Sequence, residues 1–90
     1  LIPDEYGIHS MYPNPFNPVI NINYGMPENN VMVIKVYDIS GKEIQTLLSN
    51  YQIAGFHSIT WNATSYPSGI YLVQMLSGVF LQTQKILLVK

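Results

Sequence analysis

Apolar residues along this chain occur in short runs, separated by turn-forming residues at intervals of about ten positions. In residues 19–24, Ile20, Ile22 and Tyr24 alternate with polar residues, which is the pattern of a strand with one buried face. No stretch shows the periodicity of a helix. The pattern predicts seven strands, over residues 8–12, 19–24, 31–37, 43–48, 56–61, 70–76 and 79–89.

This number of strands and the spacing of the turns predict an all-β domain, an immunoglobulin-like antiparallel β-sandwich of about seven strands. The last two strands are apolar on both faces for much of their length, which predicts a central position for the pair. We predict Ser77-Gly78 as the two-residue turn between them. The residues predicted to face the core are Met32, Ile34, Val36, Ile44 and Trp61.

Five further positions have predicted roles in turns and strand ends. Asp38 and Gly41 stand where a type I turn prefers aspartate and glycine. Gly55 and Gly69 precede apolar strands. Tyr71 lies at the start of the sixth strand, where such sandwiches often place a tyrosine whose hydroxyl bonds to upstream backbone.

The segment YPNPFNP, residues 12–18, holds three prolines around one phenylalanine. Each proline fixes its own φ, favours an extended residue before it and removes one N–H donor. One interpretation is a plug along a sheet edge, with Phe16 anchored in one end of the sandwich. The other is a linear motif displayed for a receptor. The residues concerned are Pro13, Asn14, Pro15, Phe16, Asn17 and Pro18.

Composition narrows the classes of function. The 90 residues contain no cysteine, which excludes disulfides and thiolate metal sites. Four lysines, no arginine and a net charge of −1 exclude a basic nucleic-acid surface. The apolar runs are too short for membrane insertion. We expect residues 1–7 to be a linker from a missing upstream protein and residues 8–90 to be the folded domain, as an isolated monomer or weak dimer.

No group of residues predicts catalysis, a metal or another cofactor. His57 has no serine and acid at a telling spacing, and its strand position favours a packed, hydrogen-bonded imidazole that shares a face with Trp61. The acidic residues form no pair suited to glycoside hydrolysis and no loop suited to calcium. The seven tyrosines are interpreted as core and rim packing, with a platform for stacking sugars as the alternative. We predict that the chain is not an enzyme.

Five motifs in order carry a resemblance to a known family. They are YPNPFNP before an alternating strand, VYDISGKEI, AGFHSITWN, SGIYLVQM and QKILLVK. Over roughly residues 8–90 the chain resembles the C-terminal sorting domain of the type IX secretion system of Bacteroidetes-type Gram-negative bacteria. That family is related to the immunoglobulin-like domain of the flagellar hook-capping protein.

The resemblance implies a signal domain that is exported through the periplasm and read by an outer-membrane translocon. It also implies that a surface sortase commonly removes the domain and attaches the upstream cargo to the cell surface. The implied destination is therefore the cell surface or the extracellular space. The family's marked positions correspond to Pro13, Asn14, Pro15, Phe16, Asp38, Gly41, Gly55, His57, Trp61, Gly69, Tyr71, Lys85 and Lys90.

Most of these residues also have a structural role, but Lys85 and Lys90 do not. Our hypothesis is that the translocon reads the last two strands, including Gly69 and Tyr71, with both lysines as polar handles. The simpler alternative is that they are solubilising charges on an exposed strand. The alternative function is a non-catalytic interaction module for adhesion, carbohydrate binding or spacing.

Overall fold

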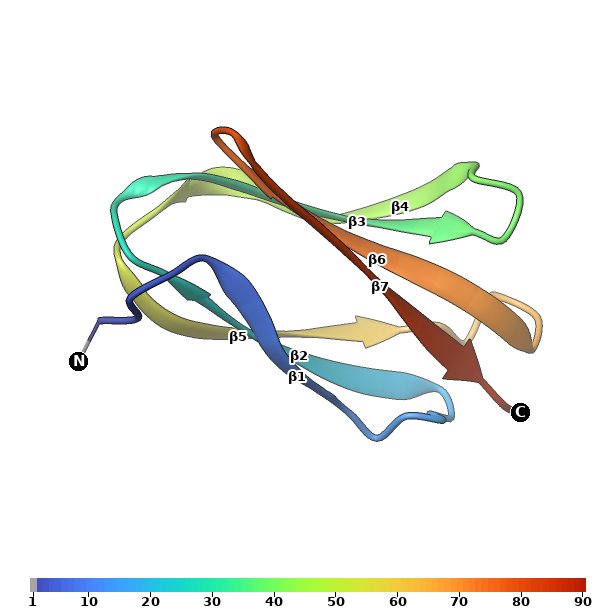
Figure 1. The fold of residues 1–90 in the computed structure, drawn as a ribbon. Helices are drawn as coiled ribbons and strands as arrows, with labels where there is room; N and C mark the ends of the chain where they lie inside the picture. Colours follow the sequence, from blue (N-terminus) through green and yellow to red (C-terminus); the bar gives the residue numbers. More distant parts are fainter. Residues whose placement is uncertain (1) are drawn as a thin grey trace.

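The structure, a computed structural model, describes residues 2–90 and consists of two packed antiparallel sheets (Figure 1). The strands are β1 (Gly7–Tyr12), β2 (Val19–Met26), β3 (Asn30–Asp38), β4 (Glu43–Gln52), β5 (Gly55–Asn62), β6 (Gly69–Ser77) and β7 (Phe80–Leu88). The three-stranded sheet has the order β1-β2-β5, and the four-stranded sheet has the order β4-β3-β6-β7. The predicted immunoglobulin-like sandwich of about seven strands is confirmed.

The core lies between the sheets because every second residue of the central strands β2, β3 and β6 is a buried, mostly apolar side chain. Met32, Ile34 and Val36 of β3 are fully buried, as predicted. Ile44 is only partly buried, since β4 is an edge strand with a single neighbour. The other large, fully buried side chains are Trp61, Tyr24, Phe16, Ile20, Ile22, Met26, Met75, Ile86 and Leu88.

The prediction of a central position for the final strand pair is wrong for β7. This strand pairs only with β6 and forms the edge of its sheet. Its inner face is buried through Ile86 and Leu88, whereas Leu81 and Leu87 on the other face are exposed. Apolar residues on both faces therefore did not indicate burial on both faces.

The predicted turn between β6 and β7 is displaced by one residue. Ser77 and Phe80 are paired, so that the two-residue turn is Gly78-Val79. Gly78 has a φ of +59°, which suits the first central position of a type II′ turn. Ser77 instead belongs to β6, and its buried hydroxyl donates to the carbonyl oxygen of Val31 at 2.7 Å.

Part of the predicted linker packs on the sandwich. Pro3 is buried, and the Tyr6 ring stacks on Phe80 with a centroid distance of 5.4 Å. The Tyr6 hydroxyl also donates to the Glu28 carboxylate at 3.0 Å, and Gly7 already belongs to β1. Leu1 lies outside the described residues. An upstream protein remains a prediction.

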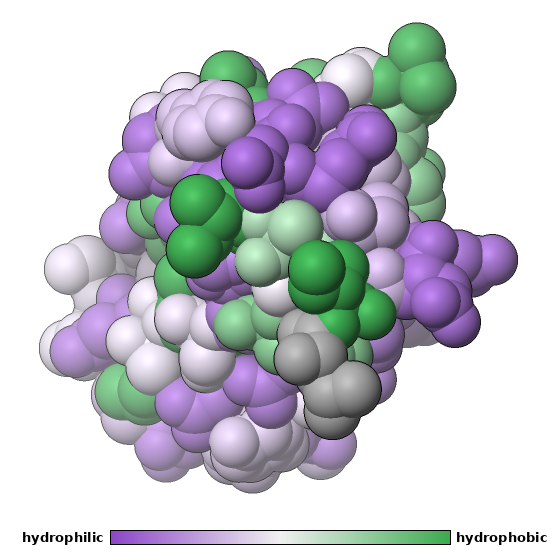
Figure 2. All heavy atoms as spheres, turned by 90° about the vertical axis from the view of Figure 1, so that its left-hand side faces the viewer, coloured by the Kyte–Doolittle hydropathy of each residue, from purple (hydrophilic) through white to green (hydrophobic). Residues whose placement is uncertain are grey.

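The described residues 2–90 form an elongated molecule of 36 × 23 × 17 Å. The chain enters at one end of the sandwich, and β7 leads to Lys90 at the other end (Figure 1). Figure 2 looks onto the entry end, where groups of apolar residues lie among polar ones. Within residues 2–90 no helix is long and apolar enough to cross a membrane.

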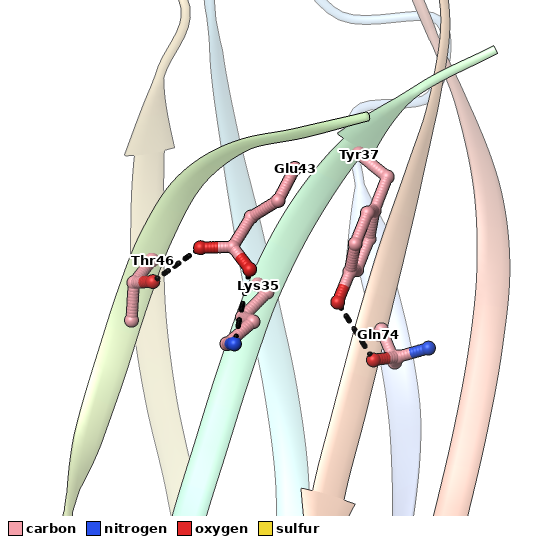
Figure 3. Close-up of polar contacts among 5 residues, drawn as sticks. All are labelled: Lys35, Tyr37, Glu43, Thr46 and Gln74. Atoms are coloured by element: carbon pink, nitrogen blue, oxygen red, sulfur yellow. Dashed lines mark hydrogen bonds and ion pairs between the residues drawn. The ribbon is translucent and has the colours of Figure 1, made fainter. Parts of the chain in front are cut away.

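The outer face of the four-stranded sheet carries a pair of opposite charges. Lys35 on β3 and Glu43 on β4 approach to 3.0 Å, and Thr46 donates a further hydrogen bond to Glu43 (Figure 3). The hydrogen bond and the opposite charge raise the pKa of Lys35 and lower that of Glu43. Because both side chains are solvated, such a pair contributes little to stability.

Candidate recognition site at the C-terminal end

Residues 13–18, here called the proline strap, lie beside the final part of β7. The Phe16 amide donates to the carbonyl oxygen of Leu87 at 2.9 Å, and the Val89 amide donates to the carbonyl oxygen of Phe16 at 2.9 Å. The Asn14 side-chain oxygen accepts from the Leu87 amide at 3.1 Å. The strap therefore satisfies backbone groups that an edge strand would otherwise expose.

Four aromatic rings meet below the strap. Phe16 is 2% exposed, and its ring centroid lies 5.7 Å from that of Trp61. Trp61 also contacts Tyr66 and Tyr71, with centroid distances of 5.6 and 5.5 Å. The Trp61 ring N–H is satisfied by Gln45 at 2.9 Å, so that a large apolar ring is buried without an unpaired donor. This aromatic cluster joins the strap to β5, β6 and the loop between them.

Tyr71 makes the backbone contact predicted for its position. Its hydroxyl donates to the carbonyl oxygen of Pro67 at 2.5 Å, which fixes the loop that leads into β6. Burial, together with the nearby Asp38 carboxylate, raises the pKa of the Tyr71 hydroxyl. Gly69, which opens β6, has a φ of +154°, a conformation that favours glycine. Tyr66 holds the loop from the other side, because its hydroxyl donates to the carbonyl oxygen of Ile44 at 3.1 Å.

Asp38 and Gly41 form the turn between β3 and β4. The Gly41 amide donates to the Asp38 carbonyl oxygen at 3.0 Å, and Gly41 has a φ of +90°. One Asp38 carboxylate oxygen accepts from the Ser40 hydroxyl at 2.6 Å and from the Lys42 amide at 3.0 Å. These hydrogen bonds lower the pKa of Asp38. The pair stabilises the turn through contacts that are local to it.

The two lysines differ in their surroundings. Lys90 is tied to the loop before β6, because its backbone amide donates to the Ser68 hydroxyl at 2.9 Å and its ammonium group donates to the Thr64 carbonyl oxygen at 2.5 Å. Lys85 is exposed on β7, in register with Leu72 of β6. Within residues 2–90 its ammonium group makes no polar contact. Of the two ammonium groups, that of Lys85 is therefore the one without an intramolecular hydrogen bond among the described residues.

Gly55 and His57 are not part of this site. They lie at the start of β5, towards the entry end of the sandwich (Figure 1). The His57 ring stacks on Tyr24 with a centroid distance of 5.3 Å, and its Nε2 lies 2.8 Å from the carbonyl oxygen of Ile53. These contacts give the imidazole the packed, hydrogen-bonded role that was predicted for it.

The sequence did not indicate Tyr66 as a member of the aromatic cluster. Its only signal was an aromatic residue inside the longest loop, and such residues occur in many exposed loops. The tyrosines do not gather into a stacking platform, because Tyr24 and Tyr71 are buried whereas Tyr12 and Tyr51 are exposed in different sheets. Among residues 2–90 no three histidine or acidic side chains come together as metal ligands would.

Comparison with known proteins places the chain in a family. The model of the family described as secretion system C-terminal sorting domain matches residues 10–90, which include the strap, the aromatic cluster and both lysines. No curated protein and no solved structure matches the chain.

Proposed function

The chain belongs to the family of secretion system C-terminal sorting domains, and from this premise we propose that a type IX translocon reads it at the C-terminal end of the sandwich. Membership of the family supports a C-terminal type IX sorting signal and implies export through the outer membrane. The proposal adds where the signal is read, which residues carry it, and how the domain is afterwards removed.

The observation that carries the proposal is that several of the residues marked by the family resemblance meet at one end, although Gly55 and His57 lie at the other end. The proline strap, Trp61, Tyr71 and Lys90 come from distant parts of the sequence and contact one another through the aromatic cluster and the end of β7. A preceding cargo would join the sandwich at the opposite end (Figure 1). The translocon can therefore approach the C-terminal end without meeting the cargo.

Lys85 is the residue that we propose as the polar handle for the translocon. Its ammonium group is exposed and makes no hydrogen bond within residues 2–90, whereas the exposed ammonium group of Lys90 is held in place by a hydrogen bond to the Thr64 carbonyl oxygen. A solvated, unpaired charge beside a rigid surface contributes to orientation and to the rate of association with a complementary partner. Lys90 then acts mainly by fixing the loop before β6.

Removal of the domain by a sortase would require extended backbone that can enter a protease. Because Pro3 is buried and Tyr6 packs on Phe80, we propose that the cut falls upstream of Pro3. We propose that the cut is made in trans by a separate sortase. Attachment of the released cargo to the cell surface would follow as a second part of the same proposal.

The test is export of a reporter. Residues 1–90 are fused to a periplasmic reporter in a host with a functional type IX system, and surface reporter is measured. We expect export by the unaltered domain and a strong reduction by Lys85→Gln. Lys42→Gln, which changes an exposed lysine in the β3–β4 turn, is the matched control. A reporter that stays in the periplasm would instead favour an interaction module or spacer.

If the Lys85→Gln and Lys42→Gln domains export the reporter equally well, the proposed recognition of Lys85 by the translocon is refuted, although the sorting function stands. Deleting residues 86–90 would be less informative, because it removes the buried Ile86 and Leu88 and therefore unfolds β7 as well as removing the signal.

A further inference from the structure

The outer face of the three-stranded sheet differs in chemistry from the rest of the surface. None of the residues in β1, β2 and β5 is Asp, Glu, Lys or Arg. The strand pairing places Ser10, Asn23 and Ser58 in one row across the sheet. Asn21 and Thr60 are paired in the next row. This face therefore presents amides and hydroxyls without charge.

Two aromatic rings border this polar row. His9 is the extra residue where the pairing of β1 with β2 shifts register, a bulge that re-aims its side chain. Its ring centroid lies 5.2 Å from that of Phe56, which is 58% exposed. A Cβ on Gly25 would lie 2.6 Å from His9 Nε2, so the glycine allows the imidazole to lie directly over the sheet.

The rings and the polar row enclose a shallow open cavity of about 420 Å³. It is lined by His9, Ser10, Asn23, Phe56 and Ser58, with Tyr24 and His57 behind them. The Asn23 side-chain amide donates to the Ser10 hydroxyl at 3.0 Å, which fixes the amide orientation. Within residues 2–90, the Asn23 Oδ1 and the Ser58 hydroxyl have no hydrogen-bond partner. The cavity thus combines an apolar wall with a polar floor whose Asn23 Oδ1 and Ser58 hydroxyl are open to solvent and to a ligand.

We propose that this cavity binds a neutral glycan. A sugar ring offers an apolar C–H face to an aromatic ring and hydroxyls to amide and hydroxyl groups, and the cavity supplies both. An aromatic wall with a few placed polar groups is the usual composition of a small-molecule site. The absence of charged residues from the three strands disfavours anionic ligands, and the polar row disfavours a lipid surface. Ser10, Asn23 and Ser58 lie in a row with the spacing of neighbouring strands, which suits contacts with successive sugar units of an extended glycan.

The test uses the 90-residue chain with cellohexaose and mannohexaose as separate probes, followed by NMR. We expect saturable shifts for Asn23, Ser58 and the Phe56 ring. Phe56→Ala should weaken binding about tenfold or more, because it removes the stacking ring. Tyr51→Ala, which removes an exposed aromatic ring of β4 in the other sheet, should leave the affinity unchanged. Asn23→Ala should weaken binding without moving core resonances.

No saturable shift with either hexasaccharide up to its solubility limit would overturn the proposal. Equal losses for Phe56→Ala and Tyr51→Ala would overturn it as well, because binding would then be non-specific. Export of the reporter by Phe56→Ala should match that of the unaltered domain. The glycan site and the sorting function therefore succeed or fail independently.

Discussion

The two ends of the sandwich are built differently. At the C-terminal end, the proline strap, the aromatic cluster and Lys90 tie together segments from across the sequence. At the entry end, an open groove of about 770 Å³ lies between residues 2–9, Phe56 and the start of β7. Ile53 and Val79 are exposed, and Figure 2 shows groups of apolar residues among polar ones on this end. The difference indicates that long-range contacts hold the C-terminal end in one packed arrangement, whereas the entry end keeps an open groove and exposed apolar side chains.

The largest difference should come from removing a ring at each end. Phe16→Ala deletes a buried ring of the aromatic cluster and should lower the free energy of unfolding by about 3–5 kcal/mol. Phe56→Ala deletes an exposed ring at the entry end and should change it by less than about 0.5 kcal/mol. Urea denaturation of both variants measures the contrast, and similar losses would show that the ends do not differ in packing.

A smaller difference is expected between glycines. Gly69 has a φ of +154°, so Gly69→Ala should strain the start of β6 by about 1–3 kcal/mol. Gly7 is not among the glycines with positive φ, and an added Cβ would meet its nearest neighbour, Gln82, at an ordinary 3.7 Å. Gly7→Ala should therefore be nearly neutral in thermal unfolding. A stability loss at Gly7 as large as at Gly69 would contradict this account.

The hydroxyl of Tyr71 should contribute less than the Phe16 ring. Tyr71→Phe keeps the ring in the cluster but leaves the Pro67 carbonyl oxygen without its donor, and should lower stability by about 0.5–1.5 kcal/mol. Tyr51→Phe removes the hydroxyl of an exposed ring and is the control. If the two changes are equivalent in denaturant titration, the backbone contact contributes nothing measurable.

The smallest effect should be the dependence of stability on acid. The folded pKa of Asp38 is lowered, so its contribution is present above the unfolded pKa of about 3.9 and is lost as the pH falls through the folded value. Asp38→Asn should therefore reduce the loss of stability on acidification. Glu43→Gln serves as a comparison, because the pKa of Glu43 is lowered by Lys35. If the stability of Asp38→Asn falls with pH as steeply as that of the unaltered domain, protonation of Asp38 does not contribute to the acid dependence.

Local patterns in the sequence were sufficient for the strands and for the core residues of β2 and β3. In residues 19–24 apolar and polar residues alternate, and in residues 31–37 Lys35 marks the exposed face of a mostly β-branched run, so the inward residues of both strands were predictable. The turn at Asp38 and Gly41 was predictable for the same reason, because its hydrogen bonds lie within five residues. Family resemblance then supplied the function that composition alone left open.

Long-range pairing was not predictable from local patterns. The contact of Phe16 with Leu88 joins residues near opposite ends of the sequence, and no local signal encodes it. β7 was expected to be central because it is apolar on both faces, although it is an edge strand covered at its end by the strap. The candidate glycan site depends on a bulge at His9 and a cross-strand row, which appear only once register is known.

The contact between the strap and β7 can form only after the whole domain has been synthesised and folded. Leu87 and Val89 are held by Asn14 and Phe16, which are synthesised at the other end of the domain. A chain truncated before its C-terminus lacks the end of β7, and in an unfolded chain the strap and the end of β7 do not meet. A receptor that required this paired surface would therefore accept only cargo whose C-terminal domain has been completely synthesised and folded.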